Sequence, residues 1–300
     1  MNAIVDAKAR SPAWLDRQLY PFKSRWANVQ GAKLHYVDEG QGPVLLMLHG
    51  NGSWSFGFRR TIPILSKHFR CIAVDHAGFG LSTACPGFSF KPADHSALIE
   101  AFVDQLKLQD LRLMVEDWGG PIGLGLAGRR PELIHTLFIG NTWAWPAQGI
   151  PQLERFSKMA GSPIGQLLII RFNALTRFAV PNVGMNRKLT KAERAGYTGP
   201  YPTPDSRRPQ AIFPKEILAS RDYLAAVEAG LAKLRDTPAL LLWADSDSGF
   251  GEAERQRFEK LLPKAETVIL RNARHFAHED APKELADAVI GFEIARERRR

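Results

Sequence analysis

One stretch, 113–125 (LMVEDWGGPIGLG), limits the folds open to this chain more than any other. An apolar run ends in an acid and a tryptophan, two glycines follow, and the pattern then becomes that of an amphipathic helix. This order predicts a buried strand, a very tight turn and a helix, with the side chain of Asp117 raised above the end of the strand. Taken alone, Asp117 is more simply explained as a helix N-cap, because Asp accepts hydrogen bonds from free N–H groups at a helix start.

Short apolar runs of strand length alternate with helical patterns on both sides of this stretch. The predicted strands are 31–37 in an edge hairpin, 44–48, 71–75, 111–115, 136–139, 239–243 and 267–270, and the predicted helices are 53–68, 92–106, 222–234, 251–262 and 282–296. Strands that alternate with helices form a parallel sheet through right-handed crossovers. The sequence therefore predicts an α/β fold, with Asp117 at the carboxyl end of a central strand, where open α/β sheets place their ligand sites.

The segment from 143 to about 214 interrupts this alternation. It contains helical pieces at 153–159, 164–178 and 191–196, broken by prolines and glycines, and no run typical of a strand. A segment of about 70 residues without strands offers a thin core for an independent domain. We therefore expect residues 1–142 and 216–300 to form one α/β core, and residues 143–215 to form a helical cap inserted over the carboxyl edge of the sheet.

The composition is that of an ordinary globular protein, with 45% hydrophobic and 24% charged residues. The formal net charge is +9, but Lys and Arg are spread along the chain and the densest basic run, 296–300, is terminal. Two cysteines give no disulfide framework, the N-terminus lacks the apolar region of a signal peptide, and no run approaches the roughly 20 apolar residues of a membrane span. We expect a soluble, cytoplasmic protein with neither nucleic acid nor a membrane as partner, and the oligomeric state stays open.

Two later loops carry groups that would complete a hydrolytic site with Asp117. Nucleophilic hydrolysis on this kind of scaffold needs a nucleophile, an acid and a histidine in that chain order, each placed after a strand. Asp245 and Asp247 follow the strand at 239–243, and His275 follows the last strand. Their joint occurrence at the expected places argues against coincidence.

The sequence resembles the haloalkane dehalogenases of the α/β-hydrolase superfamily over nearly its whole length. The segments that carry the resemblance are His49-Gly50-Asn51, Asp75-His76-Ala77-Gly78-Phe79-Gly80-Leu81-Ser82, Asp117-Trp118-Gly119-Gly120, Asn141-Thr142-Trp143, Pro202-Thr203-Pro204 with Ser206-Arg207-Arg208-Pro209, and His275-Phe276 with Glu279-Asp280. The Asp-Trp pair is shared with epoxide hydrolases, whereas its combination with Asn after His-Gly is more specific. The resemblance implies an α/β-hydrolase fold with a helical cap and hydrolysis of a carbon–halogen bond.

The resemblance also implies a two-step reaction, which the residue types justify. Asp117 is ionised near neutral pH and needs no base to attack a saturated carbon. The halide needs donors as it leaves, and the family pattern assigns this to the indole N–H of Trp118 and the side-chain amide of Asn51. His275 then removes a proton from the water that attacks the Asp117 ester, while the backbone N–H groups of Trp118 and Asn51 stabilise the oxyanion. The products are an alcohol, a halide and a proton, with no metal or organic cofactor.

Family members carry the acid that orients the histidine either as Glu after the strand before the cap or as Asp after the next strand. The first position holds Asn141 here, so the acid is expected in the later loop. We assign it to Asp247, four residues beyond Trp243 as in the family, with Asp245 as the fallback. Glu116 occupies a position where a His often precedes the nucleophile, and the sequence does not explain its role.

Other activities remain alternatives at this point. An epoxide hydrolase would use the same ester mechanism with two tyrosines of the cap as acids, and Tyr197 and Tyr201 are the only tyrosines between 143 and 215. Asn51 favours a halide over an epoxide, because an amide donor suits an anion. A cofactor-free oxygenase on this scaffold is less favoured, and binding modules of the same fold commonly lack part of the catalytic set, which is complete here.

Several residues in or near the motifs are given no catalytic role. Asp280 is interpreted as the N-cap of the last helix. His76, His95 and His278 lack the spacing of metal ligands. The tryptophans at positions 143 and 145 either line the pocket at the mouth of the cap or pack in the core.

Overall fold

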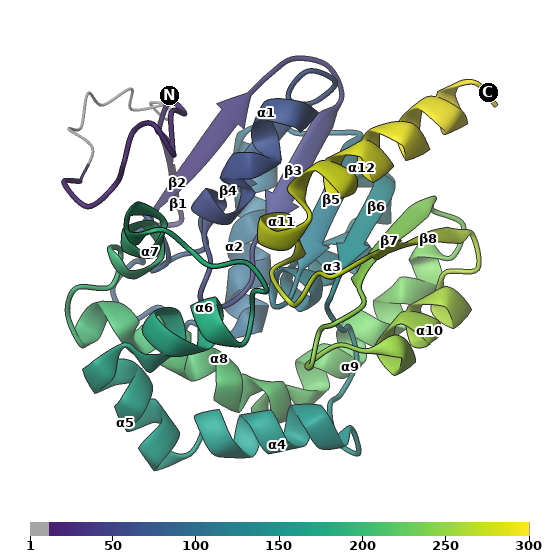
Figure 1. Cartoon of the computed structure of the whole chain (residues 1–300). Helices are drawn as coiled ribbons and strands as arrows, with labels where there is room; N and C mark the ends of the chain where they lie inside the picture. The colour runs from purple at the N-terminus through teal and green to yellow at the C-terminus, as the bar shows by residue number, and fades with distance from the viewer. Residues whose placement is uncertain (1–11, 300) are drawn as a thin grey trace.

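The computed structural model describes residues 12–299 and has an eight-stranded sheet at its centre (Figure 1). The strand order is β1-β2-β4-β3-β5-β6-β7-β8. The strands are β1 (Arg25–Val29), β2 (Ala32–Glu39), β3 (Val44–Leu48), β4 (Arg70–Val74), β5 (Leu111–Glu116), β6 (Ile134–Gly140), β7 (Ala239–Ala244) and β8 (Ala265–Leu270). The pairs β1–β2 and β2–β4 are antiparallel. Along the rest of the sheet, from β4 through β3, β5, β6 and β7 to β8, every pair is parallel. This is the predicted α/β architecture.

Helices cover both faces of this sheet. On one face α2 (Pro92–Gln105) and α9 (Arg221–Leu231) pack against α3 (Gly119–Arg129), and on the other α1 (Ile62–Leu65) and α11 (Ala277–Asp280) pack against α12 (Pro282–Glu297). α10 (Glu252–Leu261) lies between β7 and β8 in the chain. Between β6 and β7 the chain forms α4 (Pro151–Ala160), α5 (Pro163–Phe172), α6 (Val180–Asn182), α7 (Lys191–Thr198) and α8 (Arg208–Ala219). These five helices lie away from the faces of the sheet (Figure 1).

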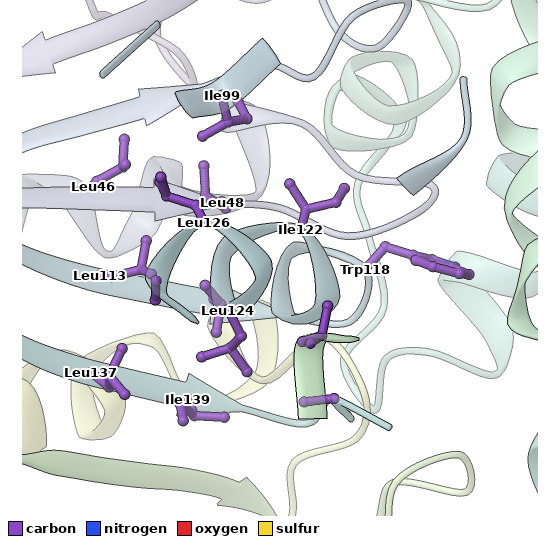
Figure 2. Packing of buried hydrophobic residues seen from close by; sticks show 14 of the residues in the cluster. Leu46, Leu48, Ile99, Leu113, Trp118, Ile122, Leu124, Leu126, Leu137 and Ile139 are labelled. Atoms are coloured by element: carbon purple, nitrogen blue, oxygen red, sulfur yellow. The ribbon is translucent and has the colours of Figure 1, made fainter. Parts of the chain in front are cut away.

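Strand side chains alternate between two apolar cores, one on each face of the sheet. On β3, Leu46 and Leu48 belong to the core under α3, and Leu45 and Met47 belong to the opposite core. All four side chains are fully buried, as expected for a parallel strand covered by helices on both faces. Figure 2 shows the leucines and isoleucines of β3, β5 and β6 packed against those of α3, with Trp118 extending away from them at the start of the helix. This packing thus fixes the position of the start of α3, next to Asp117 and Trp118.

The segment 53–68, predicted as one helix, departs from that prediction. It contains a 3₁₀-helix, η1 (Ser55–Arg60), and the four-residue α1. The backbone N–H of Ser55 donates to the buried carboxylate of Asp75 at 2.8 Å. Pro63 lies in the first turn of α1. A proline is tolerated there because the first N–H groups of a helix have no partner within the helix, whereas further along it would interrupt the hydrogen bonding. Tertiary hydrogen bonding and a proline therefore divide the segment.

Two further differences lie between β6 and β7. The segment 164–178 is divided because α5 ends at Asn173, which adopts a left-handed conformation with φ of +55°, and a π-helical turn, η3 (Leu175–Ala179), follows. Helix α8 was not predicted, because Pro209 and Pro214 disfavour a helical interpretation. Pro209 lies in the first turn, where a proline is tolerated, and Pro214 lies inside the helix. The helix runs across residue 215, where the cap was expected to end.

The N-cap role predicted for Asp280 is wrong. The residue at the N-cap of α12 is Ala281, and no side chain caps that helix. The Asp280 carboxylate instead accepts hydrogen bonds from the backbone N–H groups of Asn186, Arg187 and Arg274, at 2.8 Å, 2.9 Å and 2.9 Å. Asp280 therefore ties the segment after α6 to the loop before α11.

No helix in the described part of the chain is long and apolar enough to cross a membrane. The N-terminal stretch used for the signal-peptide prediction lies partly outside the described residues, which begin at position 12. Cys71 and Cys85 are both free thiols, and Cys71 is buried. Burial raises the pKa of the Cys71 thiol to about 12, so this cysteine stays protonated at neutral pH.

We expect Asp280→Ala to lower the free energy of unfolding by about 1–3 kcal/mol, because three N–H groups lose a charged acceptor. Urea denaturation measures the change. Asp287→Ala is the matched control, since the Asp287 carboxylate pairs with exposed Lys283 on the surface of α12. The control is expected to change stability by less than about 0.5 kcal/mol. Equal losses in the two variants would contradict the tie that Asp280 is argued to make.

Candidate active site

The turn between β5 and α3 holds Asp117 in a left-handed backbone conformation, with φ of +46°. Its side chain does not cap α3. Glycine is required close by, because a Cβ added at Gly50 would lie 2.3 Å from the Cβ of Asp117. A Cβ added at Gly120 would lie 1.9 Å from the Oγ1 of Thr142. The glycines noted in the sequence therefore let two neighbouring loops approach the elbow.

Three hydrogen bonds fix the nucleophile candidate from both sides. The backbone N–H of Asn51, after β3, donates to Asp117 Oδ1 at 2.6 Å. The Thr142 hydroxyl donates to the Asp117 carbonyl at 2.5 Å, and the Asp117 N–H donates to the carbonyl of Asn141 at 3.1 Å. The carboxylate is thus aimed by residues that follow the two strands flanking β5.

The structure brings His275 between two carboxylates. Its Nε2 lies 3.3 Å from Asp117 Oδ2, and its Nδ1 lies 2.9 Å from Asp247 Oδ2. Asp245, the fallback for the acid, lies elsewhere: its side chain is 26% exposed and its carboxylate is 3.8 Å from Arg271. Of the two acids after β7, Asp247 is therefore the one in contact with the histidine.

Asp247 is buried but well supplied with donors. Its side chain is 2% exposed, and besides His275 it accepts from the Asn141 side-chain amide at 2.9 Å and from the N–H of Gly249 at 2.7 Å. The Asn141 side chain is itself held, because its amide oxygen Oδ1 accepts the backbone N–H of Ala244 at 2.9 Å. From the sequence alone, the only consequence drawn from Asn141 is that its position lacks an acid. Its place after β6, beside the loop of Asp247, was the signal for this second role.

The charges of His275 and its partners are coupled. Burial by itself lowers the pKa of the histidine, but the carboxylates of Asp247 and Asp117 outweigh burial and raise that pKa well above its ordinary value. Burial likewise raises the pKa of Asp247, yet the attraction of His275 and the donated hydrogen bonds leave it below its usual range. The two carboxylates therefore favour the protonated form of His275.

A pocket of about 210 Å³ opens above these groups, and its walls are mostly apolar. Apart from Asn51, Asp117, Asp247 and His275, its lining includes Trp118, Trp143, Leu153, Phe156, Leu175, Val180, Ile217, Phe250 and Phe276. No group of three or more acidic, His or Cys side chains in the described chain could hold a metal ion. The polar groups thus converge at one end of an apolar pocket, which is the usual character of a small-molecule site.

The two predicted halide donors both line this pocket. The Trp118 ring stacks on Phe213 and meets Trp143 edge to face, and its indole N–H makes no hydrogen bond within residues 12–299. The Asn51 side-chain amide donates to the carbonyl of Gln210 in α8 at 3.1 Å. Because an amide nitrogen carries two hydrogens, Asn51 keeps one donor for a ligand.

The two tryptophans whose place the sequence left open are separated by the structure. Trp143 lines the pocket, and its buried indole N–H lacks a partner among the described residues. Trp145 packs in the core against Phe258, with the Arg257 guanidinium 4.4 Å from its ring centroid. Of Trp143 and Trp145, only Trp143 is therefore available to a ligand.

Glu116, which the sequence did not explain, pairs with a histidine to which no chemistry was assigned. His278 Nδ1 lies 2.6 Å from Glu116 Oε2, and the His278 side chain is 1% exposed. Glu116 does not line the main pocket. The pair connects the strand end before Asp117 to α11, which follows His275, so it contributes to the positions of the loops that carry Asp117 and His275.

The cap tyrosines considered as acids for an epoxide are not among the residues that line the pocket. The Tyr197 hydroxyl donates to the buried carboxylate of Glu279 at 2.6 Å. Tyr201 is buried against Phe79. Neither hydroxyl is in place to protonate a group bound beside Asp117.

Comparison with known proteins agrees with this geometry. A family model described as the alpha/beta hydrolase fold matches residues 43–282, so the chain belongs to the α/β hydrolases. Haloalkane dehalogenase 2 of Mycobacterium bovis is 40% identical over 277 residues, which cover 92% of this chain and 96% of that protein. Within the superfamily, the chain belongs to the haloalkane dehalogenase family. It is thus a hydrolase of carbon–halogen bonds, with halogenated small molecules as substrates and halide as a product.

Solved structures and a second kind of relative add to this comparison. The crystal structure of an ancestral haloalkane dehalogenase matches with a TM-score of 0.84 at 30% identity, covering 91% of this chain and 99% of that one. Haloalkane dehalogenase DbeA from Bradyrhizobium elkani matches with a TM-score of 0.82 at 27% identity and the same coverage, 91% and 99%. A cis-3-alkyl-4-alkyloxetan-2-one decarboxylase of Shewanella oneidensis is 32% identical, over 91% of this chain and 89% of that protein.

We expect Asp247→Asn to move the titration of His275 to lower pH. The Asp247 charge contributes most among the interactions that raise the histidine pKa, and an amide cannot replace it. NMR titration of the imidazole resonances measures the shift. Asp245→Asn removes the same charge outside contact with His275 and is expected to leave the titration unchanged. The assignment of the acid fails if the two variants titrate alike.

Proposed function

We propose that Asp117 is the nucleophile, His275 the base and Asp247 its orienting acid in the hydrolysis of haloalkanes, with Asn51 and Trp118 as halide donors. The observation that carries the proposal is the position of His275, 3.3 Å from one carboxylate and 2.9 Å from the other, at the floor of an apolar pocket. A carboxylate in such a pocket suits attack on a saturated carbon, because the product is an ordinary ester.

In the first step Asp117 attacks the carbon that bears the halogen. A carbon–oxygen bond forms, the carbon–halogen bond breaks with its electron pair, and an alkyl ester of Asp117 and a halide ion result. The halide is received by the indole N–H of Trp118 and the remaining amide hydrogen of Asn51. Donors that are already in place stabilise charge in a dry pocket without reorganisation, which is the most effective form of electrostatic catalysis.

The second step follows from the charge change of the first. Alkylation removes the negative charge of Asp117, one of the two charges that raise the pKa of His275. The histidine therefore gives up its proton more readily and becomes a base for water, while Asp247 stays to stabilise the imidazolium that forms. The water oxygen attacks the ester carbonyl and gives its proton to His275, and the oxyanion is received by the backbone N–H groups of Asn51 and Trp118. When this intermediate collapses, the bond between the carbonyl carbon and the alkyl oxygen breaks, the alcohol leaves with the proton from His275, and the Asp117 carboxylate is restored. The N–H of Asn51 already points at Asp117 Oδ1 from 2.6 Å.

The name of the Shewanella relative supplies a second candidate activity. An oxetan-2-one ring contains a saturated carbon bonded to a carboxylate oxygen, so Asp117 would displace a carboxylate where it otherwise displaces a halide. This attack opens the ring and leaves an Asp117 ester that carries the displaced carboxylate on the neighbouring carbon. Loss of CO₂ then breaks the bond between that carbon and the carboxylate, its electron pair forms the alkene, and the Asp117 carboxylate leaves with the electrons of its bond to the substrate. The alkene and CO₂ account for every atom of the substrate, and Asp117 is restored. The apolar walls of the pocket suit alkyl substituents. The 32% identity to that protein is lower than the 40% identity to the dehalogenase, which favours the halide reaction.

We also propose a cap made of residues 143–215, with α8 completing it beyond that boundary. This segment supplies pocket walls from α4 and from η3, while the polar groups come from loops of the sheet. A cytoplasmic location is proposed from the two free cysteines, because reducing compartments keep thiols unpaired.

We expect His275→Ala to release one equivalent of bromide from a short bromoalkane and then stop, because the ester forms but no base activates water. Intact mass should rise by the mass of the alkyl group less one hydrogen, because the alkyl group replaces the carboxyl proton of Asp117. Asp117→Asn should neither gain mass nor release bromide, and His68→Ala, at an exposed histidine, should behave as wild type.

The same assay is run with a simple epoxide and with a cis-3,4-dialkyl oxetan-2-one. Diol without halide release would indicate an epoxide hydrolase, and CO₂ with alkene would support the second candidate. Absence of both turnover and adduct with every substrate would remove the hydrolase mechanism altogether.

Trp118→Phe is expected to slow the first step by roughly 10²–10³-fold, because it removes one donor to the developing anion and keeps an aromatic ring. Stopped-flow measurement of bromide release isolates this step, and inhibition by added bromide reports halide binding. Trp145→Phe is the control, since its indole packs in the core outside the pocket. An equal effect of the two substitutions would assign Trp118 a packing role.

A further inference from the structure

Large apolar side chains are exposed together on the cap. They are Phe156 (38%), Met159 (65%), Ile164 (72%), Leu167 (53%), Leu168 (46%), Phe172 (57%), Phe178 (60%) and Val183 (60%), and we refer to these eight residues as the cap face. In the described chain, Ile294 is the only other large apolar side chain with comparable exposure. Contiguous exposed apolar surface of this kind marks an interaction site.

The cap face adjoins the mouth of the active-site pocket. Its members come from α4, α5 and the segment from η3 to just past α6, and α4 and α5 pack against each other. In Figure 1, α4 and α5 form the outer edge of the molecule farthest from the sheet. Phe156 and Val183 belong to the cap face and also line the pocket. A partner that covered the cap face would therefore meet the opening of the pocket.

The same part of the chain holds almost all of the net charge. Residues 143–215 contain eleven Lys and Arg and three Asp and Glu, a net charge of +8 out of +9 for the whole chain. Arg155, Arg171 and Arg177 are exposed on α4, α5 and η3, and none of them forms an ion pair with a described residue. The pKa of Arg207 is lowered by partial burial and by the charge of Arg177. Positive charge thus accumulates beside exposed apolar side chains.

We propose that the cap face docks on an anionic lipid surface, with the pocket mouth at the boundary between headgroups and acyl chains. Helices that combine apolar and basic side chains bind such surfaces by burying the apolar groups and by attracting anionic headgroups. A lipid surface accepts apolar side chains without matching their shape, whereas a protein partner must be complementary to them.

A second copy of this chain is the less favourable occupant. An isologous dimer brings the same patch of both subunits together. Two cap faces in contact would juxtapose two segments that each carry a net charge of +8, which opposes association. An anionic surface reverses the sign of this interaction.

The proposal replaces the expectation from sequence that no membrane is a partner. That expectation depended on the absence of an apolar run long enough to span a bilayer, and docking at the interface requires no such run. One consequence, which depends on the proposed function, is that an apolar substrate dissolved in the lipid would enter the pocket without crossing water. The lipid contact itself does not depend on that function.

The test is cosedimentation of the full chain with phosphatidylcholine vesicles that contain or lack phosphatidylglycerol, at low and high salt. We expect binding only with phosphatidylglycerol and at low salt. The triple variant Arg155→Glu, Arg171→Glu, Arg177→Glu should bind at least roughly 100-fold more weakly, since each basic side chain near an anionic surface contributes roughly fivefold. The matched control, Lys67→Glu, Lys233→Glu, Arg298→Glu, makes the same change of charge at exposed sites outside the cap and should stay within a few-fold of wild type.

A second variant tests the apolar contribution without a change of charge. Ile164→Ser with Leu168→Ser should also weaken binding to the anionic vesicles, and neither residue lines the pocket. Turnover of a water-soluble haloalkane, compared with wild type, reports whether each variant is folded.

The proposal is overturned by equal binding to both kinds of vesicle, by no binding to either, or by equal loss in the two triple variants. The proposal is also overturned if the wild-type protein does not bind the vesicles and light scattering finds that it is an oligomer, while the double variant Ile164→Ser, Leu168→Ser is a monomer. In that case the cap face is a contact between copies. If the wild-type protein dehalogenated none of the substrates tested, the proposed function would be wrong, and the result on lipid binding would be unaffected.

Discussion

The left-handed backbone of Asp117, with φ of +46°, is the constraint around which the site is arranged. A side chain in this conformation costs on the order of 1–3 kcal/mol and persists only where the surroundings impose it. Here they do so from both neighbouring strands: the N–H of Asn51, after β3, holds the carboxylate, and Thr142, after β6, holds the carbonyl. Gly50 lets the first of these loops come close enough. The parallel register of β3, β5 and β6 therefore determines where the Asp117 carboxylate points, and the two apolar cores maintain that register.

In the proposed mechanism, the charge in the site changes with the state of Asp117, and this change sets the order of the two steps. With both carboxylates ionised, the raised pKa of His275 favours the protonated imidazole, which is a poor base. Formation of the ester neutralises Asp117 and leaves Asp247 as the only carboxylate in contact with the ring. His275 thus becomes able to act as a base only after the ester that the water must attack has formed. This sequence requires Asp247 to stay ionised while buried, which explains why Asn141 and Gly249 both donate to it.

The sequence is sufficient to locate residues whose place follows from their position along the chain, and insufficient where the place depends on the path of a loop. The strands and the order of nucleophile, acid and histidine could be predicted because each follows an apolar run. The choice between Asp245 and Asp247 needed the family pattern, because both lie in one loop and only its fold turns one toward the histidine. Asp280 fits the local rule for an N-cap, yet its carboxylate instead accepts the backbone N–H of Arg274 in the preceding loop and that of Asn186, which is 94 residues away in the chain. Helix α8 was not predicted because its two prolines disfavour a helix in sequence. In the structure, packing against α4 and α5 compensates for the destabilising effect of these prolines.

The cap is attached to the core on one side and apolar on the other, and these two features fit together. Buried Glu279, four residues after His275, accepts hydrogen bonds from Arg59 of η1 and from Arg187 and Tyr197 of the cap. Removing one member would leave buried charge unpaired, which is strongly destabilising, so this side of the cap is held firmly to the loop of His275. The same network occupies the hydroxyl that an epoxide hydrolase would need. Because α4 and α5 lie outside the network, a surface that contacts them can orient the pocket mouth without disturbing the distances among Asp117, His275 and the acid.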